Sequence, residues 1–229
     1  MKKILNAIAA VPAFSGLAEN ELLKIKEIAV DKTSNKGAVL FSEGDKAAGF
    51  YVVVEGQIKI YKLSPDGKEQ ILHIFGPGEP VGEVPVFTGQ NFPANAQAIS
   101  NSHLLFFPRT AFLDLISRNP SLSLNMLAVL SKRLRQFTVQ IENLSLKEVP
   151  GRLASYLIVL DGEQSDTDEV TLPISKGQLA SLLGTIPETL SRIFHKMGTR
   201  GLIAVNGRHI RIIDRSGLEE TSAYGLSAD

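Results

Sequence analysis

A stretch of 25 residues without glycine or proline divides this chain and constrains its fold more than any other feature. It runs from Leu122 to Leu146, and its apolar residues recur at alternating intervals of three and four positions. That interval is the a/d repeat of a coiled coil, so the stretch predicts one long helix that pairs with a second copy of itself. The residues of this predicted dimer seam are Leu127, Leu130, Leu134, Phe137, Ile141 and Leu144.

The same pattern has a second interpretation, an amphipathic helix that lies on the core of its own domain. A helix of that kind usually shows a wider apolar stripe, whereas the residues between the seam positions, including Lys132, Arg133 and Arg135, are largely polar. The narrow stripe favours the dimer seam, although it covers fewer heptads than an extended coiled coil does.

The residues before the long helix indicate a β-rich domain. Glycine and proline recur across residues 37–89, and short β-branched or aromatic runs lie between them. Examples are residues 50–54, 57–61 and 70–75. The second run alternates, which puts Lys59 on the face opposite its isoleucines. Strands of this length and spacing predict a sandwich or barrel, preceded by a helix over residues 19–30.

The 229-residue chain is long enough for one large or two small domains, and its 44% hydrophobic content is sufficient to bury a core. It contains no cysteine, which excludes disulfides, zinc–cysteine sites, thiolate-bound haem and iron–sulfur clusters held by cysteine. No apolar run approaches the roughly 18 residues of a membrane span, and no signal-peptide cleavage site is evident. We therefore expect a cytoplasmic protein that does not contact a membrane.

The formal net charge is zero, but the charges are unevenly placed. Between Ser175 and Arg215, seven basic residues stand against two acidic ones, a net charge of +5, while the acidic stretch 161–169 balances the total. A scattered basic set is consistent with a solvated surface as well as with an anionic partner, so its interpretation depends on the motifs around it.

Two helices in this basic region are marked by their ends. Ser175 and Gln178 have the spacing of a capping box, and Gly184 permits the left-handed turn that stops the helix. Thr185 and Glu188 have the same spacing and predict a second capped helix. Two capped helices joined by a tight glycine turn are the layout of a helix-turn-helix.

A predicted hairpin follows the second helix directly. Residues 202–205 and 208–213 alternate as strands do, and Asn206-Gly207 between them predicts a type I′ turn, which needs positive φ at both central residues. The hairpin makes the module winged, and a winged helix-turn-helix with a local positive charge predicts DNA binding.

The second helix is expected to enter the major groove N-terminus first. Glu188, Ser191 and Arg192 share one face of it, and all three side-chain types can read base edges. Alternatively, Glu188 only caps its helix and Arg192 only contacts phosphate. The residues expected to contact phosphates, and so to position without specifying, are Ser175, Lys176, Thr185, Thr189, Lys196 and Arg208.

Motifs in both halves resemble the CRP/FNR superfamily of transcription regulators, over nearly the whole chain. Residues 41–44 (FSEG), 50–56 (FYVVVEG) and 82–87 (GEVPVF) look like the effector domain of that family. Residues 187–192 (PETLSR) look like its recognition helix.

The resemblance implies an α+β architecture in three parts. These are a double-stranded β-helix (jelly-roll) effector domain at 1–118, a dimerisation helix at 119–147, and a winged helix-turn-helix domain at 148–229. It also implies a homodimer that binds double-stranded DNA, contacts RNA polymerase, and changes its DNA affinity when an effector binds the jelly roll.

The family alignment implies an effector pocket formed by His73, Gly82, Glu83, Pro93, Ala94 and Asn95. In the cyclic AMP receptor, an Arg-Ser pair about ten residues beyond the position of Glu83 holds the phosphate, and this chain has neither residue at 92–95. A phosphate without its guanidinium is poorly held, which argues against a cyclic nucleotide. The recognition helix is similar to FNR-type readers, which implies an inverted repeat of TTGA-like half-sites about one helical turn apart.

Residues 144–147, 156–158, 186–195 and 210–214 look especially like the dissimilatory nitrate respiration regulators, which the hybrid-cluster-protein regulators resemble in turn. That branch implies nitric oxide sensing through haem b, for which His73 is the candidate axial ligand. The alternative is a partly buried histidine bonded to a neighbour, since single histidines outside a motif seldom bind metal.

Two further functions fit parts of the pattern. A sandwich of this type can be a metal-dependent cupin enzyme, but such a site needs clustered ligands, and the sandwich has only His73 and His103, thirty residues apart. The other is a constitutive DNA-binding regulator whose effector pocket is vestigial. We expect a regulator rather than an enzyme.

Overall fold

The computed structural model describes residues 2–164 and 167–226, and the chain forms two compact units, Met1–Leu134 and Arg135–Asp229. Part of the acidic stretch predicted at 161–169 lies outside the described residues, at positions 165 and 166. Within the described part of the chain, no helix is both long and apolar enough to cross a bilayer.

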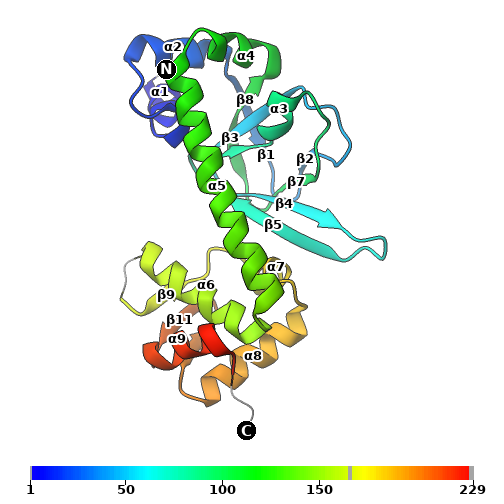
Figure 1. Cartoon of the computed structure of the whole chain (residues 1–229), viewed down its shortest axis with the longest axis vertical. Coiled ribbons are helices and arrows are strands. Elements are labelled where there is room, and N and C mark those ends of the chain that lie inside the picture. Colours follow the sequence, from blue (N-terminus) through cyan, green and yellow to red (C-terminus); the bar gives the residue numbers. More distant parts are fainter. Residues whose placement is uncertain (1, 165–166, 227–229) are drawn as a thin grey trace. The chain divides into compact units, whose positions relative to one another are not determined.

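The first unit is built on two antiparallel four-stranded sheets (Figure 1). One has the order β1-β8-β3-β6, formed by Val30–Ser34, Ser102–Pro108, Gly49–Glu55 and Pro80–Val81. The other has the order β2-β7-β4-β5, formed by Val39–Phe41, Asn95–Ala98, Ile58–Leu63 and Glu69–Phe75. The sandwich predicted from the glycine-punctuated runs is therefore confirmed.

Both faces of the first sheet are covered, which explains the continuous apolar run in β3. One core includes Val53 and Phe75 from the two sheets, and a second joins Phe50 and Phe107 to helices. The elements around that second core are α1 (Lys2–Ala9), the 3₁₀ turn Pro12–Phe14, α2 (Glu19–Ile28) and α4 (Arg109–Ser117). Helix α2 ends two residues earlier than predicted because the chain already pairs as β1 from Val30.

Lys59 of β4 is buried, which the alternation of that strand does not indicate. Its ammonium pairs with Glu69 across the β4–β5 hairpin and lies 4.4 Å from the centroid of the Tyr61 ring. A charge on a strand can therefore be buried when its partner comes from the neighbouring strand.

A single helix, α5 (Pro120–Leu146), confirms the long helix predicted from the sequence (Figure 1). Leu122 and Met126 belong to the core of the first unit, and Arg133 is buried on the same stripe of the helix. The helix therefore packs on its own domain through one stripe, as the second interpretation of the pattern proposed.

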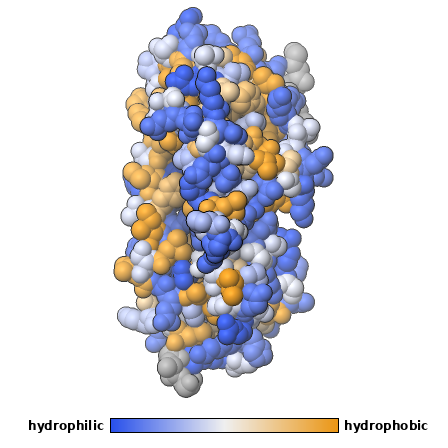
Figure 2. Space-filling view, turned by 90° about the vertical axis from the view of Figure 1, so that its right-hand side faces the viewer, coloured by the Kyte–Doolittle hydropathy of each residue, from blue (hydrophilic) through white to orange (hydrophobic). Residues whose placement is uncertain are grey.

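The predicted dimer seam occupies a different stripe of α5, which stays accessible in the single chain. Leu127, Leu134 and Ile141 are 59, 68 and 64% exposed, Leu144 is exposed, and Leu130 and Phe137 are half-buried. Elsewhere, on the face shown in Figure 2, hydrophobic residues form small groups among hydrophilic ones. A row of large apolar side chains exposed to water on one helix is unfavourable, and such a row is typical of an interaction surface.

The second unit comprises the C-terminal part of α5, helices α6 to α9 and a three-stranded sheet of order β10-β11-β9. In chain order the elements are α6 (Val149–Gln164), β9 (Glu169–Thr171), α7 (Lys176–Leu182), α8 (Pro187–Thr199), β10 (Ile203–Asn206), β11 (His209–Ile212) and α9 (Arg215–Tyr224). The predicted order of two helices and a hairpin is confirmed.

Candidate nucleic-acid interface and effector site

Helix α7 begins at the predicted capping box. The N–H of Gln178 donates to Ser175 Oγ at 3.2 Å, and the N–H of Ser175 donates to Gln178 Oε1 at 2.9 Å. The helix ends at Leu182, and two residues later Gly184 has a φ of +65°, the left-handed conformation that glycine adopts without strain. Because the hydroxyl of Ser175 serves the cap, its predicted phosphate contact lacks separate support.

The second predicted capping box, at Thr185, is wrong. The N-cap of α8 is Ile186, which provides no side-chain hydrogen bond, and Pro187 occupies the first turn. Proline has no N–H to satisfy and its φ is already helical, so this end needs less capping. Thr185 instead closes the preceding turn, where its N–H donates to Ala180 O at 2.9 Å.

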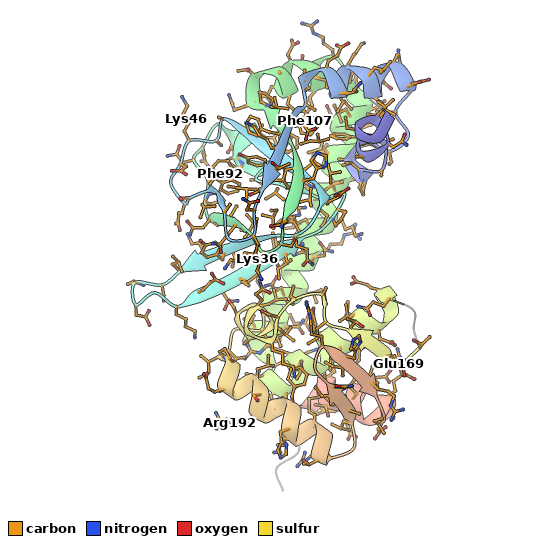
Figure 3. All side chains as sticks on the ribbon, turned by 180° about the vertical axis from the view of Figure 1, so that it is seen from behind. Lys36, Lys46, Phe92, Phe107, Glu169 and Arg192 are labelled. Carbon is orange, nitrogen blue, oxygen red and sulfur yellow. The ribbon has the colours of Figure 1, made fainter. Side chains whose placement is uncertain are left out.

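Helix α8 separates its residues cleanly between a buried and an exposed face. Its buried residues are Leu190, Ile193, Phe194 and Met197. The three predicted base readers, Glu188, Ser191 and Arg192, are all exposed, and the structure brings them together on the outer face. The side chain of Arg192 extends away from the helix (Figure 3), and its Nη2 donates to Thr189 Oγ1 at 3.1 Å.

The residues predicted to contact phosphates differ in their surroundings. Lys196 is exposed, whereas Lys176 is half-buried, with its ammonium 5.0 Å from the centroid of the Phe194 ring. Arg208 is exposed, and its Nε donates to Leu172 O at 3.0 Å, which ties the wing to the chain before α7. Lys176 and Arg208 therefore have structural contacts in addition to any contact with DNA.

The wing turn lies one residue later than predicted. Asn206 pairs with His209, so the two central residues are Gly207 and Arg208. Of these, Gly207 alone has a positive φ, +62°. A positive φ at the first central residue is the pattern of a type II′ turn, which suits hairpins as well as type I′ does.

In the first unit, the predicted pocket residue Glu83 is 1% exposed and forms an ion pair with Arg133 of α5, itself 9% exposed. Arg133 also donates to Pro80 O at 3.2 Å and lies 4.6 Å from the centroid of the Phe75 ring. Burial raises the pKa of Glu83, and the charge of Arg133 opposes that rise. No sequence pattern indicates this pair, because the two residues are 50 positions apart.

Two aromatic rings fill the space beside Gly82, which precedes the short helix α3 (Val84–Thr88). Phe41 and Phe92 are stacked with 3.7 Å between their centroids, and a Cβ at position 82 would lie within about 3 Å of both rings. Gly82 is therefore required here for close packing as well as for its φ of +77°. The sequence analysis includes Phe41 in the 41–44 motif, but it does not predict that Phe41 stacks on Phe92.

The predicted pocket segment 93–95 is held by contacts within the protein. Lys62 Nζ donates to Pro93 O at 2.9 Å and pairs with Glu43, whose N–H donates to Asn95 Oδ1 at 3.0 Å. Ala94 is buried. This segment lacks an arginine, and the neighbouring lysine is already engaged, so residues 93–95 and Lys62 offer no free guanidinium or ammonium for a phosphate.

The surroundings of His73 are those of a partly buried histidine beside an aromatic ring and a carboxylate. Its ring lies edge-on to Phe75, 4.5 Å between centroids, and its buried Nε2 is 3.7 Å from Glu79 Oε1. Burial raises the pKa of Glu79, but the nearby His73 and a hydrogen bond from the N–H of Gly76 outweigh it, so the net pKa is lowered. Among the described residues, no group of three histidines or carboxylates could hold a metal ion.

Comparisons with known proteins agree with both units. The cyclic nucleotide-binding domain family matches residues 32–119, and the Crp-like helix-turn-helix domain family matches residues 151–221. The probable transcriptional regulator flp of Lacticaseibacillus casei is 31% identical over 93% of this chain and 96% of its own length. The cyclic AMP receptor protein of Thermus thermophilus is 30% identical over 94% of this chain and 98% of its own length.

A solved structure is similar over the same range. That of DNR from Pseudomonas aeruginosa is 34% identical and covers 96% of this chain and 97% of its own, with a TM-score of 0.52. With full-length relatives at this identity and both domain families in the expected order, the chain belongs to the CRP/FNR family of transcription regulators.

Proposed function

We propose that the chain is a homodimeric regulator that binds an inverted repeat of TTGA-like half-sites, one half-site for each α8. The observation that carries this proposal is the outer face of α8, where Glu188, Ser191 and Arg192 stand together and exposed on a helix whose other face is buried. A guanidinium reads guanine O6 and N7, a carboxylate accepts from cytosine N4, and a serine hydroxyl can do either.

Arg192→Ala tests base reading most directly. We expect it to weaken binding to the preferred inverted repeat by about 1–3 kcal/mol and to relax the preference at one base pair of each half-site. The measurement is the dissociation constant, at fixed salt, for the preferred duplex and for duplexes substituted at single positions. Lys196→Ala is the matched control, because loss of a phosphate contact weakens all duplexes alike. Equal losses for Arg192→Ala on preferred and random DNA would contradict the assignment.

The exposed stripe of α5 supports the homodimer. A parallel partner helix would cover the seam residues Leu127, Leu134 and Ile141, which water otherwise surrounds. In this proposal, residues 1–118 sense the effector, 119–147 dimerise and 148–229 bind DNA. The dimer acts in the cytoplasm, where it contacts RNA polymerase at its promoters.

We propose a small effector that is not a cyclic nucleotide. The family of the first unit is defined by nucleotide binding, yet Pro93, Ala94 and Asn95 provide no cation for a phosphate, and Lys62 is held by Glu43. Charge-assisted bonds to phosphate supply most of the recognition in such a site, so their loss is decisive. The likeness to the nitrate respiration branch suggests nitric oxide as the signal, but the contacts of His73 oppose haem as its carrier.

The second candidate function is a constitutive regulator with a vestigial pocket, and the Phe41–Phe92 stack specifically favours it. We expect a titration with haem to give the same visible spectrum for the wild type and for His73→Ala. A new Soret band that depends on His73 would restore the haem hypothesis. Affinity for the inverted repeat that responds to haem, nitric oxide or a cyclic nucleotide would exclude the vestigial pocket, and affinity that responds to none would support it.

A further inference from the structure

Helices α5 and α6 follow one another with almost no chain between them. The N–H of Lys147 still donates to Asn143 O at 3.1 Å, in continuation of α5, and the N–H of Arg152 donates to Glu148 O at 3.0 Å, at the start of α6. Because no residue lies between Lys147 and Glu148, the direction of α6 depends on a single short turn. The C-terminal half of α5 and all of α6 belong to the same compact unit.

A small polar network fixes this turn. Lys147 Nζ donates to Ser155 Oγ of α6 at 2.9 Å, and Ser155 Oγ lies 2.7 Å from Ser222 Oγ of α9. The hydroxyl of Ser155 donates to Gly151 O at 2.9 Å, so its single hydrogen is used and Ser222 must be the donor in the serine pair. Every hydrogen-bonding capacity of Ser155 is thereby filled, which makes the network geometrically definite.

Helix α9 can reach this turn because residue 151 is glycine. A Cβ at position 151 would lie 3.2 Å from Thr221 O and 3.5 Å from Ser222 O. The last turn of α9 therefore approaches α6 closely, and Ser155 and Ser222 link the Lys147 ammonium to this end of α9. A cation near the C-terminus of a helix is favoured by the helix dipole.

We infer that Lys147 is a positioning residue for DNA recognition, and that with Ser155 and Ser222 it holds the DNA-binding helices at a set angle to the dimer helix. This inference rests on the proposed function, since an angle matters only when two copies bind one duplex. In a dimer, a fixed angle sets the separation of the two α8 helices and therefore the half-site spacing that both can occupy. Without the network, each copy still binds a half-site, but the pair tolerates more spacings.

The test uses the full chain and three duplexes. These are the inverted repeat that the wild type selects from a randomised pool, the same repeat with one extra central base pair, and a single half-site. Lys147→Met and Ser222→Ala are the test variants, and Lys147→Arg is the conservative one. The matched controls are Lys132→Met and Ser145→Ala, because both residues are exposed on α5.

We expect both test variants to bind the half-site as the wild type does and the selected repeat about tenfold more weakly, since part of the gain from simultaneous binding is lost. Their preference for the selected spacing over the extended one should fall by a similar factor, and Lys147→Arg should restore it. If Ser222→Ala and Lys147→Met keep the full spacing preference of the wild type, the inference is overturned while the proposed function stands. If the wild type itself prefers no repeat over the half-site, the proposed function fails first.

Discussion

Leu134→Glu combined with Ile141→Glu should convert the protein to a monomer and lower its affinity for the selected inverted repeat by roughly 10²–10⁴-fold. Both side chains are exposed in the single chain, so the substitutions should leave each chain folded. In a dimer they would place four carboxylates in an apolar seam, where desolvation and mutual repulsion oppose pairing. Sedimentation velocity gives the oligomeric state, and titration of the duplex gives the affinity.

Val139→Glu is the matched control for this pair of substitutions. Val139 is also an exposed apolar residue of α5, but it falls at the outer f position of the heptad, away from the seam. It should leave both the dimer and the affinity unchanged. A dimer that survives the double substitution, or one that Val139→Glu also disrupts, would place the interface on another surface.

Arg133→Met should destabilise the first unit by about 3–5 kcal/mol, because it leaves Glu83 buried without its countercharge. The double variant Arg133→Met/Glu83→Gln should recover most of that loss, since a neutral pair of similar volume carries no uncompensated charge. Arg135→Met, on the exposed side of α5, should change stability by less than about 0.5 kcal/mol. Amide hydrogen exchange in β3 and β8 measures the stability of this unit by itself. A single variant as stable as the wild type would mean that the pair contributes nothing.

The loss of folding stability caused by Arg133→Met should depend on pH. Burial raises the pKa of Glu83 and Arg133 opposes the rise, so removing Arg133 raises that pKa further. A carboxyl with a raised pKa in the folded chain holds its proton more tightly there than when unfolded. The stability that this carboxyl contributes is therefore fully present below its pKa in the unfolded chain. It is lost as the pH rises through its pKa in the folded chain. The deficit should be largest near neutral pH and should shrink as the pH is lowered.

Features set by neighbouring residues were predictable from the sequence. The capping box at Ser175, the left-handed stop at Gly184 and the long helix each depend on a few consecutive positions, and all three are confirmed. The local errors in the DNA-binding module also have local causes. Pro187 starts α8 without a side-chain cap at Thr185, and Gly207 takes the first central place of its turn instead of the second.

Features set by distant residues were not predictable. Arg133 looked like one more polar residue between seam positions, and its burial depends on Glu83, which lies 50 positions earlier in the sequence. The stack of Phe41 on Phe92 likewise joins residues 51 positions apart, and the motif that begins at Phe41 does not indicate that Phe92 is its partner. A periodic pattern reports which face of an element is apolar, but it does not report which partner covers that face.

The packing of Phe41 on Phe92 also sets a threshold for any molecule that enters beside Gly82. Such a molecule binds only the fraction of chains in which the rings have parted, and its apparent affinity falls by that fraction. If about one chain in a hundred is open, binding weakens about a hundredfold without the loss of a single contact to the molecule. The affinity for such a molecule would then depend on the two rings as well as on its own contacts, and replacing one ring should raise that affinity.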